Sequence, residues 1–256
     1  MNHLIGVSDI FEDLEKIGRY LPDLVNGFMM MMGMYIFALA FGFGLGLIVA
    51  IARHYGGRIS SRIATAFIEF MRGTPLVAQI LAVTILPYAI NIWLEAQGLP
   101  PFDVSWRVTI LDVYGIQRTI LNTRILLCMI TLGLNSGAYQ AEFFRGSLSS
   151  LAAGQTLAAQ SIGMTKRQEI RHIALPQGLR RAIPSWANEA VYLPKYITVA
   201  YFVGVPELFG AAKLVATRTY EALLVYGLIA IVFLVLISAI SFLLDYLYKR
   251  IRIPGL

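Results

Sequence analysis

Residues 28–52 read FMMMMGMYIFALAFGFGLGLIVAIA and contain no charged side chain. A helix needs about 20 apolar residues to cross the hydrocarbon core of a bilayer, and this run is longer than that. The whole chain has the same character, because 57% of its 256 residues are hydrophobic and 14% are charged. A soluble domain carries roughly 25% charged residues. The stretch therefore predicts an integral membrane protein.

Further apolar runs flank this first span on the C-terminal side. We expect spans at residues 75–94, 125–141, 182–205 and 222–244. The run at 182–205 is the weakest, because Pro184, Glu189, Pro194 and Lys195 interrupt it. The acidic segment 1–27 has apolar residues at helical spacing, which predicts an amphipathic helix at the membrane interface. We therefore expect an all-α polytopic protein with about five transmembrane helices, forming one domain over residues 1–256.

The first span carries glycines at alternate positions. Gly42, Gly44 and Gly46 include a Gly-x-x-x-Gly pair, which allows a neighbouring helix to approach closely. Glycine is also simply frequent in membrane helices, and the sequence leaves both interpretations open.

The distribution of cations predicts the orientation. If the first span runs from outside to inside, thirteen of the 21 Lys and Arg residues lie in cytoplasmic segments. Cytoplasmic loops carry an excess of Lys and Arg, and the opposite orientation would export most of them. The same bias accounts for the net charge of +6 without any nucleic acid partner. We therefore expect the N-terminus outside, and both the loop at 142–181 and the C-terminus in the cytoplasm.

The cytoplasmic loop contains the stretch GQTLAAQSIGMTKRQEIRHIALP at residues 154–176. Residues 155–162 favour a short helix, and Gly163 is a typical residue just after a helix end. Thr165, with a glutamine three residues later, predicts a capping box that begins a second short helix. We expect Pro176 to end that second helix. Two short helices parallel to the membrane would form a docking surface for a partner.

The spacing of this loop resembles that of the coupling loop of ABC importer permeases, where Glu-Ala-Ala, three residues, Gly, nine residues and Ile-x-Leu-Pro recur. The matching positions are Ala158, Ala159, Gly163, Ile173, Leu175 and Pro176, while Leu157 stands where the family usually has Glu. The flanks resemble the polar amino acid uptake subgroup, through Arg72-Gly-Thr-Pro75-Leu, Tyr139-x-Ala-Glu142-x-x-Arg145-Gly146 and Leu175-Pro176-Gln177. A Lys-Asp-Thr-Ser-Leu motif of that subgroup is only partly kept, as Lys195-Tyr196-Ile197-Thr198-Val199.

This resemblance implies a transport subunit rather than an enzyme. It implies two cytoplasmic ABC ATPase subunits, a second permease subunit of the same or a similar kind, and an external binding protein that delivers a polar amino acid in a bacterial or archaeal plasma membrane. The residues expected at the ATPase contact are Gly154, Gln155, Leu157, Ala158, Ala159, Gly163, Lys166 and Arg167. The three cations of this loop, Arg171 among them, could instead face lipid head groups.

Charged groups inside a membrane are costly and mark transport pathways by default. The candidates for a substrate pathway are Asn135, Glu142, Asn188, Glu189 and Lys195. Alternatively, Glu142 and Arg145 form a structural pair at the head-group level, and Glu189 and Lys195 pair with each other or with other side chains.

The chain has no Gly-x-x-x-x-Gly-Lys-[Ser/Thr] motif, so it lacks this device for binding nucleotide phosphates. We expect no cofactor and no metal in the chain itself, with Mg-ATP bound by the partner ATPase. The alternative function is an autonomous carrier driven by an ion gradient. Against it, we find no inverted repeat, and a docking loop would have no purpose in such a carrier.

Overall fold

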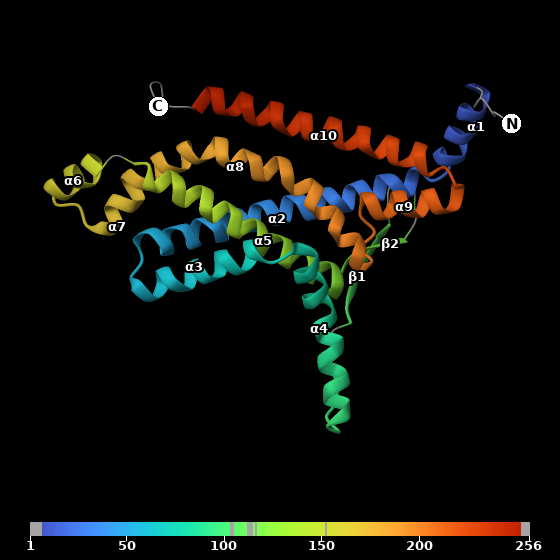
Figure 1. Ribbon diagram of the computed structural model, residues 1–256, viewed down its shortest axis with the longest axis horizontal. Coiled ribbons are helices and arrows are strands. Elements are labelled where there is room, and N and C mark those ends of the chain that lie inside the picture. The colour runs from blue at the N-terminus through green and yellow to red at the C-terminus, as the bar shows by residue number, and fades with distance from the viewer. Residues whose placement is uncertain (1–6, 103–104, 112–114, 116, 152, 252–256) are drawn as a thin grey trace. The chain divides into compact units, whose positions relative to one another are not determined.

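The computed structural model describes residues 7–102, 105–111, 115, 117–151 and 153–251. The described part is α-helical apart from one short β-hairpin, as Figure 1 shows along the chain. The helices are α1 Val7–Gly18, α2 Leu21–Tyr55, α3 Arg58–Gly73, α4 Leu76–Ala96, α5 Thr123–Ser149, α6 Ala153–Ser161, α7 Lys166–Glu169, α8 Leu175–Ile197, α9 Leu208–Thr219 and α10 Ala222–Ile251. The strands are β1 Arg107–Leu111 and β2 Gln117–Asn122, and two irregular helical segments are the π-helix η1 Ile170–Ala174 and the 3-10 helix η2 Thr198–Val203.

By length and composition, α2, α4 and α10 can each cross a membrane, and a fourth span is possible if the helical stretch 166–203 and α9, bent by 57° against each other, act as one. We predicted five spans, one more than these four. The additional predicted span, 125–141, lies in α5, which is not among the helices that are apolar enough. Its length of 27 residues is sufficient, but polar residues lower its apolarity. Several of those polar side chains, including Asn135, Ser136 and Gln140, are buried in the protein, where a helix does not need an apolar surface.

The amphipathic helix expected in residues 1–27 is present as α1, with Ile17 buried and Phe11 exposed. Residues 1–6 of that segment and Arg252 of the basic tail lie outside the described residues.

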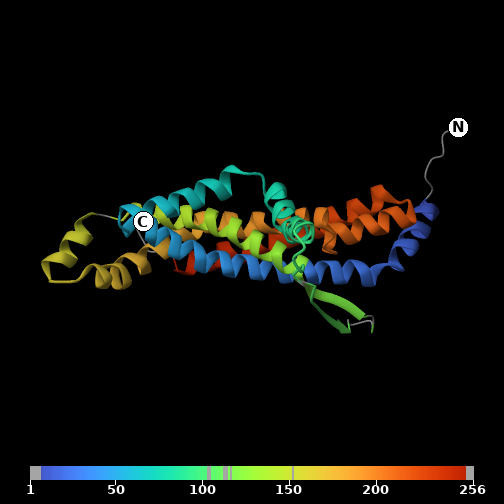
Figure 2. The same ribbon diagram turned by 90° about the horizontal axis from the view of Figure 1, so that it is seen from below.

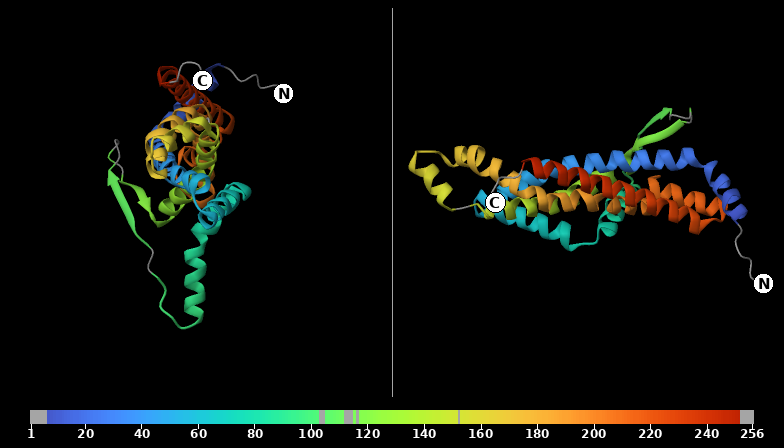
Figure 3. Two further views of the ribbon diagram at one scale, coloured as in Figure 1. Left: turned by 90° about the vertical axis from the view of Figure 1, so that its left-hand side faces the viewer. Right: turned by 90° about the horizontal axis from the view of Figure 1, so that it is seen from above.

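The chain divides into two compact units, described separately here. The first comprises Met1–Ile36, Leu76–Leu132 and Pro194–Leu236. Within it, β1 and β2 form an antiparallel hairpin with Arg107 opposite Asn122. Figure 3 (left) shows the chain leaving the C-terminal end of α4 and returning to this hairpin. The segment 95–124 lies between the predicted spans 75–94 and 125–141, and the hairpin inside it is a feature that we did not predict.

The second unit comprises Phe37–Pro75, Gly133–Leu193 and Ile237–Leu256. Its apolar core joins three helices, because Ala50 of α2, Phe144 of α5 and Ala182 of α8 are buried together and Trp186 packs against them. Figure 2 shows α6 and α7 beyond the ends of α5 and α8, to which they are connected. The loop with the candidate docking surface is therefore held by two helices of this core.

Close packing explains two of the glycines in the first span. A Cβ placed on Gly46 would lie 2.9 Å from the carbonyl oxygen of Gly137 in α5, and one placed on Gly42 would lie 3.1 Å from the Gly137 nitrogen. The first distance is shorter than real Cβ contacts, and the second is tighter than nine in ten of them. At Gly44 nothing lies within 4 Å of such a Cβ. The Gly-x-x-x-Gly pair thus allows α2 and α5 to approach closely, which was one of the two interpretations left open.

The expectation that prolines interrupt the fourth span was wrong. Helix α8 runs without a break from Leu175 to Ile197 and contains Pro176, Pro184 and Pro194. Pro176 is the second residue after the π-helix η1, whose wider turn accommodates the proline ring. Inside a membrane helix, small backbone adjustments and neighbouring groups compensate for the missing hydrogen bond.

Candidate functional site

Helix α6 ends as the sequence predicts. Gly163 has a φ of +79°, and its N–H donates to the Gln160 carbonyl at 3.0 Å. The next N–H, of Met164, donates to the Ala159 carbonyl, also at 3.0 Å. These two bonds form a Schellman motif, which satisfies carbonyls at the helix end and requires a left-handed residue. Glycine is the residue that adopts this conformation without a steric cost.

The capping box is also present. The N–H of Gln168 donates to the Thr165 hydroxyl, and the N–H of Thr165 donates to the Gln168 side-chain oxygen at 2.8 Å. The second short helix does not end at Pro176, contrary to our prediction. Instead α7 continues through the π-helix η1 into α8, with the Leu175 N–H donating to the Ile170 carbonyl five residues earlier. The wider turn accommodates the chain before the proline ring, so the loop joins α8 as one helical segment.

The outer face of α6 is apolar and exposed. Leu157 is 62% exposed and Ile162 is 74% exposed. Ala158 is exposed beside them, whereas Ala159 is buried on the inner face. The two alanines therefore have different surroundings, and Ala158 alone belongs to the outer surface. Gly154 is exposed and Gln155 is partly buried at the beginning of the helix. An exposed apolar patch on a short rigid helix is typical of a protein contact site.

A buried carboxylate holds α6 against α7, and the sequence analysis did not identify it. Glu169 is 2% exposed and accepts a hydrogen bond from the Thr156 hydroxyl at 3.0 Å. It also forms an ion pair with Lys166 at 3.2 Å. The Lys166 ammonium lies 4.8 Å from the centre of the Tyr55 ring at the end of α2. Lys166 thus serves the internal structure of the loop, while Arg167 and Arg171 are exposed. Thr156 and Glu169 are 13 residues apart, and no helical or strand periodicity relates them, so this contact could not be predicted from the sequence.

Glu142 lies between two arginines, just beyond the predicted third span. Its carboxylate accepts from Arg53 at 2.5 Å and from Arg145 at 2.6 Å. The hydrogen bond from Arg145 lowers the pKa of Glu142 below its ordinary value, against the opposing effect of partial burial, and the charges of Arg145, Arg53 and Arg72 lower it further. The side chain is about one quarter exposed. This arrangement ties the end of α2 to α5.

A ladder of buried polar groups connects α2, α5 and α8. Gln140 is fully buried, and its amide nitrogen donates to the Leu39 carbonyl at 3.2 Å and to the Ser136 hydroxyl at 3.0 Å. The indole N–H of Trp186 donates to the Gln140 carbonyl oxygen at 2.6 Å. Ser136 also makes a hydrogen bond with Glu189, which is 4% exposed. The buried Glu189 side chain therefore lies next to a polar group of the ladder.

The remaining pathway candidates have varied surroundings. Asn135 is buried, and its amide nitrogen donates to the Met71 carbonyl at the end of α3 at 2.8 Å. Asn188 and Lys195 are exposed. Of the candidates, Asn135, Glu142, Asn188 and Glu189 lie in the second unit, and Glu189 is hydrogen-bonded to Ser136 of the ladder.

Comparisons with known proteins agree with this architecture. The family described as the binding-protein-dependent transport system inner membrane component matches residues 42–253. The glutamine transport system permease protein GlnP of Escherichia coli K12 is 29% identical over 94% of this chain and 98% of the relative. The probable amino-acid permease protein YxeN of Bacillus subtilis is 30% identical over 94% of this chain and 97% of the relative.

Solved structures show the same fold. An amino acid ABC transporter crystallised with histidines matches with a TM-score of 0.70 and 24% identity, over 91% of this chain and 95% of the other. An inward-facing form of the MetNI methionine ABC transporter matches with a TM-score of 0.70 and 17% identity, over 91% and 98% of the two chains. The relatives are transport components, and the alternative of an autonomous carrier gains no support from them. The chain belongs to the family of inner membrane components of binding-protein-dependent transport systems.

Proposed function

We propose that this permease subunit imports a polar amino acid and that α6 is its contact with the ATPase. The observation that carries the proposal is the exposed apolar face formed by Leu157 and Ile162 on a loop that the contacts of Glu169 with Thr156 and Lys166 hold together. A leucine at position 157 gives this contact an apolar centre, where the family usually has a carboxylate. The amino acid substrate is supported by the names of the relatives, which include a glutamine and an L-cystine permease.

In this proposal residues 1–256 act as one transmembrane domain that pairs with a second permease subunit. Two ATPases bind Mg-ATP on the cytoplasmic side, and a binding protein delivers the substrate from outside. When the ATPases close, they move α6, and the Glu169 contacts pass this displacement to α7 and α8. The chain itself supplies no group for ATP chemistry in this scheme. In this proposal the chain converts a displacement of the cytoplasmic loop into a rearrangement of the transmembrane helices.

The coupling proposal is tested by Gly163→Val. A branched side chain in the left-handed conformation costs about 1–2 kcal/mol, so the end of α6 should be distorted while the spans remain inserted. Uptake and ATP hydrolysis are measured with the complete transporter in proteoliposomes. The expected result is ATP hydrolysis with little uptake. Gly146→Ala is the control, because Gly146 is exposed, helical and has open space around it. Normal coupling in Gly163→Val would refute the assignment of α6.

We also propose that the N-terminus is outside and the C-terminus is cytoplasmic. The cations support this orientation. The segments expected on one side of the membrane also fall in one unit, because those expected outside lie in the first unit and the loops expected inside lie in the second. A cysteine at Tyr220, which is 89% exposed, should react with an impermeant reagent in intact cells. One at Gln160 should react only after permeabilisation. The reverse pattern would overturn the orientation.

For the substrate pathway we propose Asn135, Glu142, Asn188, Glu189 and Lys195 as candidates. The support for Glu189 is the strongest, since it is a buried carboxyl group beside Ser136. Glu189→Gln should lower uptake more than it lowers thermal stability or basal ATP hydrolysis. Lys195→Met should act at the opposite end of a zwitterion. Normal uptake by both variants would assign these charges a structural role.

A further inference from the structure

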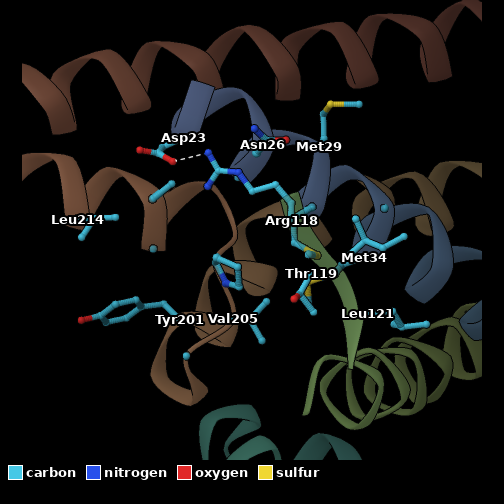
Figure 4. Close-up of a pocket in the computed structure, with 18 of the residues that line it drawn as sticks. Asp23, Asn26, Met29, Met34, Arg118, Thr119, Leu121, Tyr201, Val205 and Leu214 are labelled. Atoms are coloured by element: carbon cyan, nitrogen blue, oxygen red, sulfur yellow. Dashed lines mark hydrogen bonds and ion pairs between the residues drawn. The ribbon is translucent and has the colours of Figure 1, made fainter. Parts of the chain in front are cut away.

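The first unit contains a cavity of about 760 Å³, and none of the residues proposed above for the pathway lines it. Its walls come from the beginning of α2, the strand β2, and the segment from η2 to α9. Figure 4 shows Tyr201 and Leu214 on one side of it and Thr119 and Leu121 on the other. Cavities of roughly 300–1,000 Å³ are typical of small-molecule sites.

The lining is largely apolar, and methionine is its most frequent large residue. Met29, Met30 and Met34 of α2 and Met129 of α5 contribute, together with Leu121 and Leu214. Methionine side chains are flexible and polarisable, so they adapt to apolar groups of different shapes. Such a surface accepts many side chains without being complementary to any single one.

Two opposite charges stand at one end of this apolar space. Arg118 of β2 and Asp23 of α2 form an ion pair of 2.7 Å, and Figure 4 shows the two side chains directed toward each other. Both remain partly exposed, at 31% and 23%. They are the only charged residues among the described residues that line the cavity. The lining therefore carries one positive and one negative charge, with no net charge.

We propose that this cavity binds the substrate as a zwitterion, and that the substrate class is an amino acid with an uncharged side chain. The carboxylate binds the Arg118 guanidinium and the ammonium binds the Asp23 carboxylate, so each charge of the pair keeps an opposite partner. The side chain lies against the methionines. This inference rests on the function proposed above and specifies its substrate.

The charge balance is the reason for excluding charged side chains. A zwitterion satisfies Asp23 and Arg118 and leaves no charge unpaired. A third charge on the side chain of arginine or glutamate would enter the methionine-lined space, where the described lining offers no counter-charge. An anionic phospholipid without an ammonium group is disfavoured for a related reason, because its phosphate would approach Asp23 as well as Arg118.

The position along the chain suits a first binding step. The beginning of α2, the hairpin and the segment from η2 to α9 are those that the proposed orientation places at the outer side of the membrane. A substrate released by the binding protein would then meet this cavity on the outer side of the membrane. The cavity then acts as an entrance that accepts amino acids in general and excludes charged ones.

The test uses the complete transporter in proteoliposomes and radiolabelled L-glutamine, L-methionine, L-arginine and L-glutamate. We expect uptake of the first two and little of the last two. Asp23→Asn and Arg118→Gln should each raise the KM for the neutral substrates by about ten- to hundredfold, since each removes a charge-assisted hydrogen bond.

A charge exchange separates substrate binding from a merely structural pair. The double variant Asp23→Arg with Arg118→Asp restores an ion pair between α2 and β2, and so restores thermal stability lost by the single variants. It also exchanges the positions for carboxylate and ammonium, so an L-amino acid can no longer direct its side chain to the methionines. We expect stability to return and uptake to stay low. Recovery of both would overturn the site.

Other outcomes are equally informative. Unchanged KM values in the single variants, with intact amino acid uptake, would remove this site and leave the proposed function standing. Preferred uptake of L-arginine or L-glutamate would overturn the substrate class only. Absence of uptake of all four amino acids would overturn the proposed function together with the site. A phospholipid that co-purifies with the wild type, is lost in Arg118→Gln and is not displaced by L-glutamine would show a lipid site instead.

Discussion

The contact between α2 and α5 gives a sharp test of the packing, because it offers a matched pair of glycines on one helix. Gly46 faces α5, where an added Cβ would lie 2.9 Å from the Gly137 carbonyl oxygen and 3.0 Å from the Ala141 nitrogen. Both atoms belong to the backbone and cannot rotate away. Gly44, two residues earlier, has nothing within 4 Å of an added Cβ.

The expected energies follow from this difference. Replacing glycine by alanine inside a helix stabilises it by about 1 kcal/mol, and this gain is common to Gly44→Ala and Gly46→Ala. Inserting a carbon into a packed contact costs typically 1–3 kcal/mol, and only Gly46→Ala carries this cost. The two variants should therefore differ by about 1–3 kcal/mol. At about 2–4 °C per kcal/mol for a chain of this size, the difference in Tm is about 2–12 °C.

The assay is thermal unfolding of the purified transporter in one detergent, with both variants and the wild type measured in parallel. Gly44→Ala should unfold at or above the temperature of the wild type, and Gly46→Ala clearly below Gly44→Ala. Equal Tm values for the two alanine variants would show that α2 does not approach α5 at Gly46, and the packing described above would be wrong.

Three further predictions concern polar groups. Trp186→Phe removes the indole donor to the fully buried Gln140, which should cost about 1–3 kcal/mol and lower the Tm; an unchanged Tm would argue against this bond. The Glu207 carboxylate accepts from two N–H groups at the beginning of α9 at 2.8 Å each, so Glu207→Ala should cost about 0.5–2 kcal/mol and Glu207→Gln less; equal Tm values would exclude the cap. The pKa of Glu142 is lowered mainly by Arg145, so the stability gained from its ionisation is present above its unfolded pKa of about 4.3 and is lost as the pH falls through the lower folded pKa. The Tm difference between wild type and Glu142→Gln should therefore be full at pH 7 and decrease below about pH 4; a difference independent of pH would contradict this.

Local signals in the sequence predicted much of the helical structure. The charge-free run 28–52 lies within α2, and both the stop at Gly163 and the capping box at Thr165 are present. These features depend on residues within a few positions of one another. The prediction from the prolines was wrong for a physical reason. A proline inside a helix removes one backbone hydrogen bond, yet α8 contains three prolines and continues without a break. The sequence showed this local cost but not the packing that compensates for it.

The buried carboxylates were harder to predict. Glu169 and Glu207 are at most 2% exposed, yet in the sequence each looks like an ordinary surface residue in a polar segment. Their partners are a threonine 13 positions away and backbone N–H groups, respectively. Glu207 caps α9 through the N–H groups of Phe209 and Gly210, a local contact that we did not predict. The pairing of Thr156 with Glu169 depends instead on how the chain folds back on itself, which periodicity and spacing do not specify. The Asp23–Arg118 pair, with 95 positions between its members, was missed for the same reason.

The π-helical turn Ile170–Ala174 has a mechanical consequence. The segments α6, α7, η1 and α8 follow one another along the chain. When such a series of segments is displaced at one end, the most flexible segment undergoes most of the deformation. The Schellman motif, the capping box and the Glu169 contacts make α6 and α7 stiff, whereas the bonds of a π-helix span a wider and less regular turn. A push on Leu157 should therefore bend the chain at residues 170–174 before it strains the loop. In the proposed coupling, the stiffness of that single turn sets how much of each ATPase movement reaches α8.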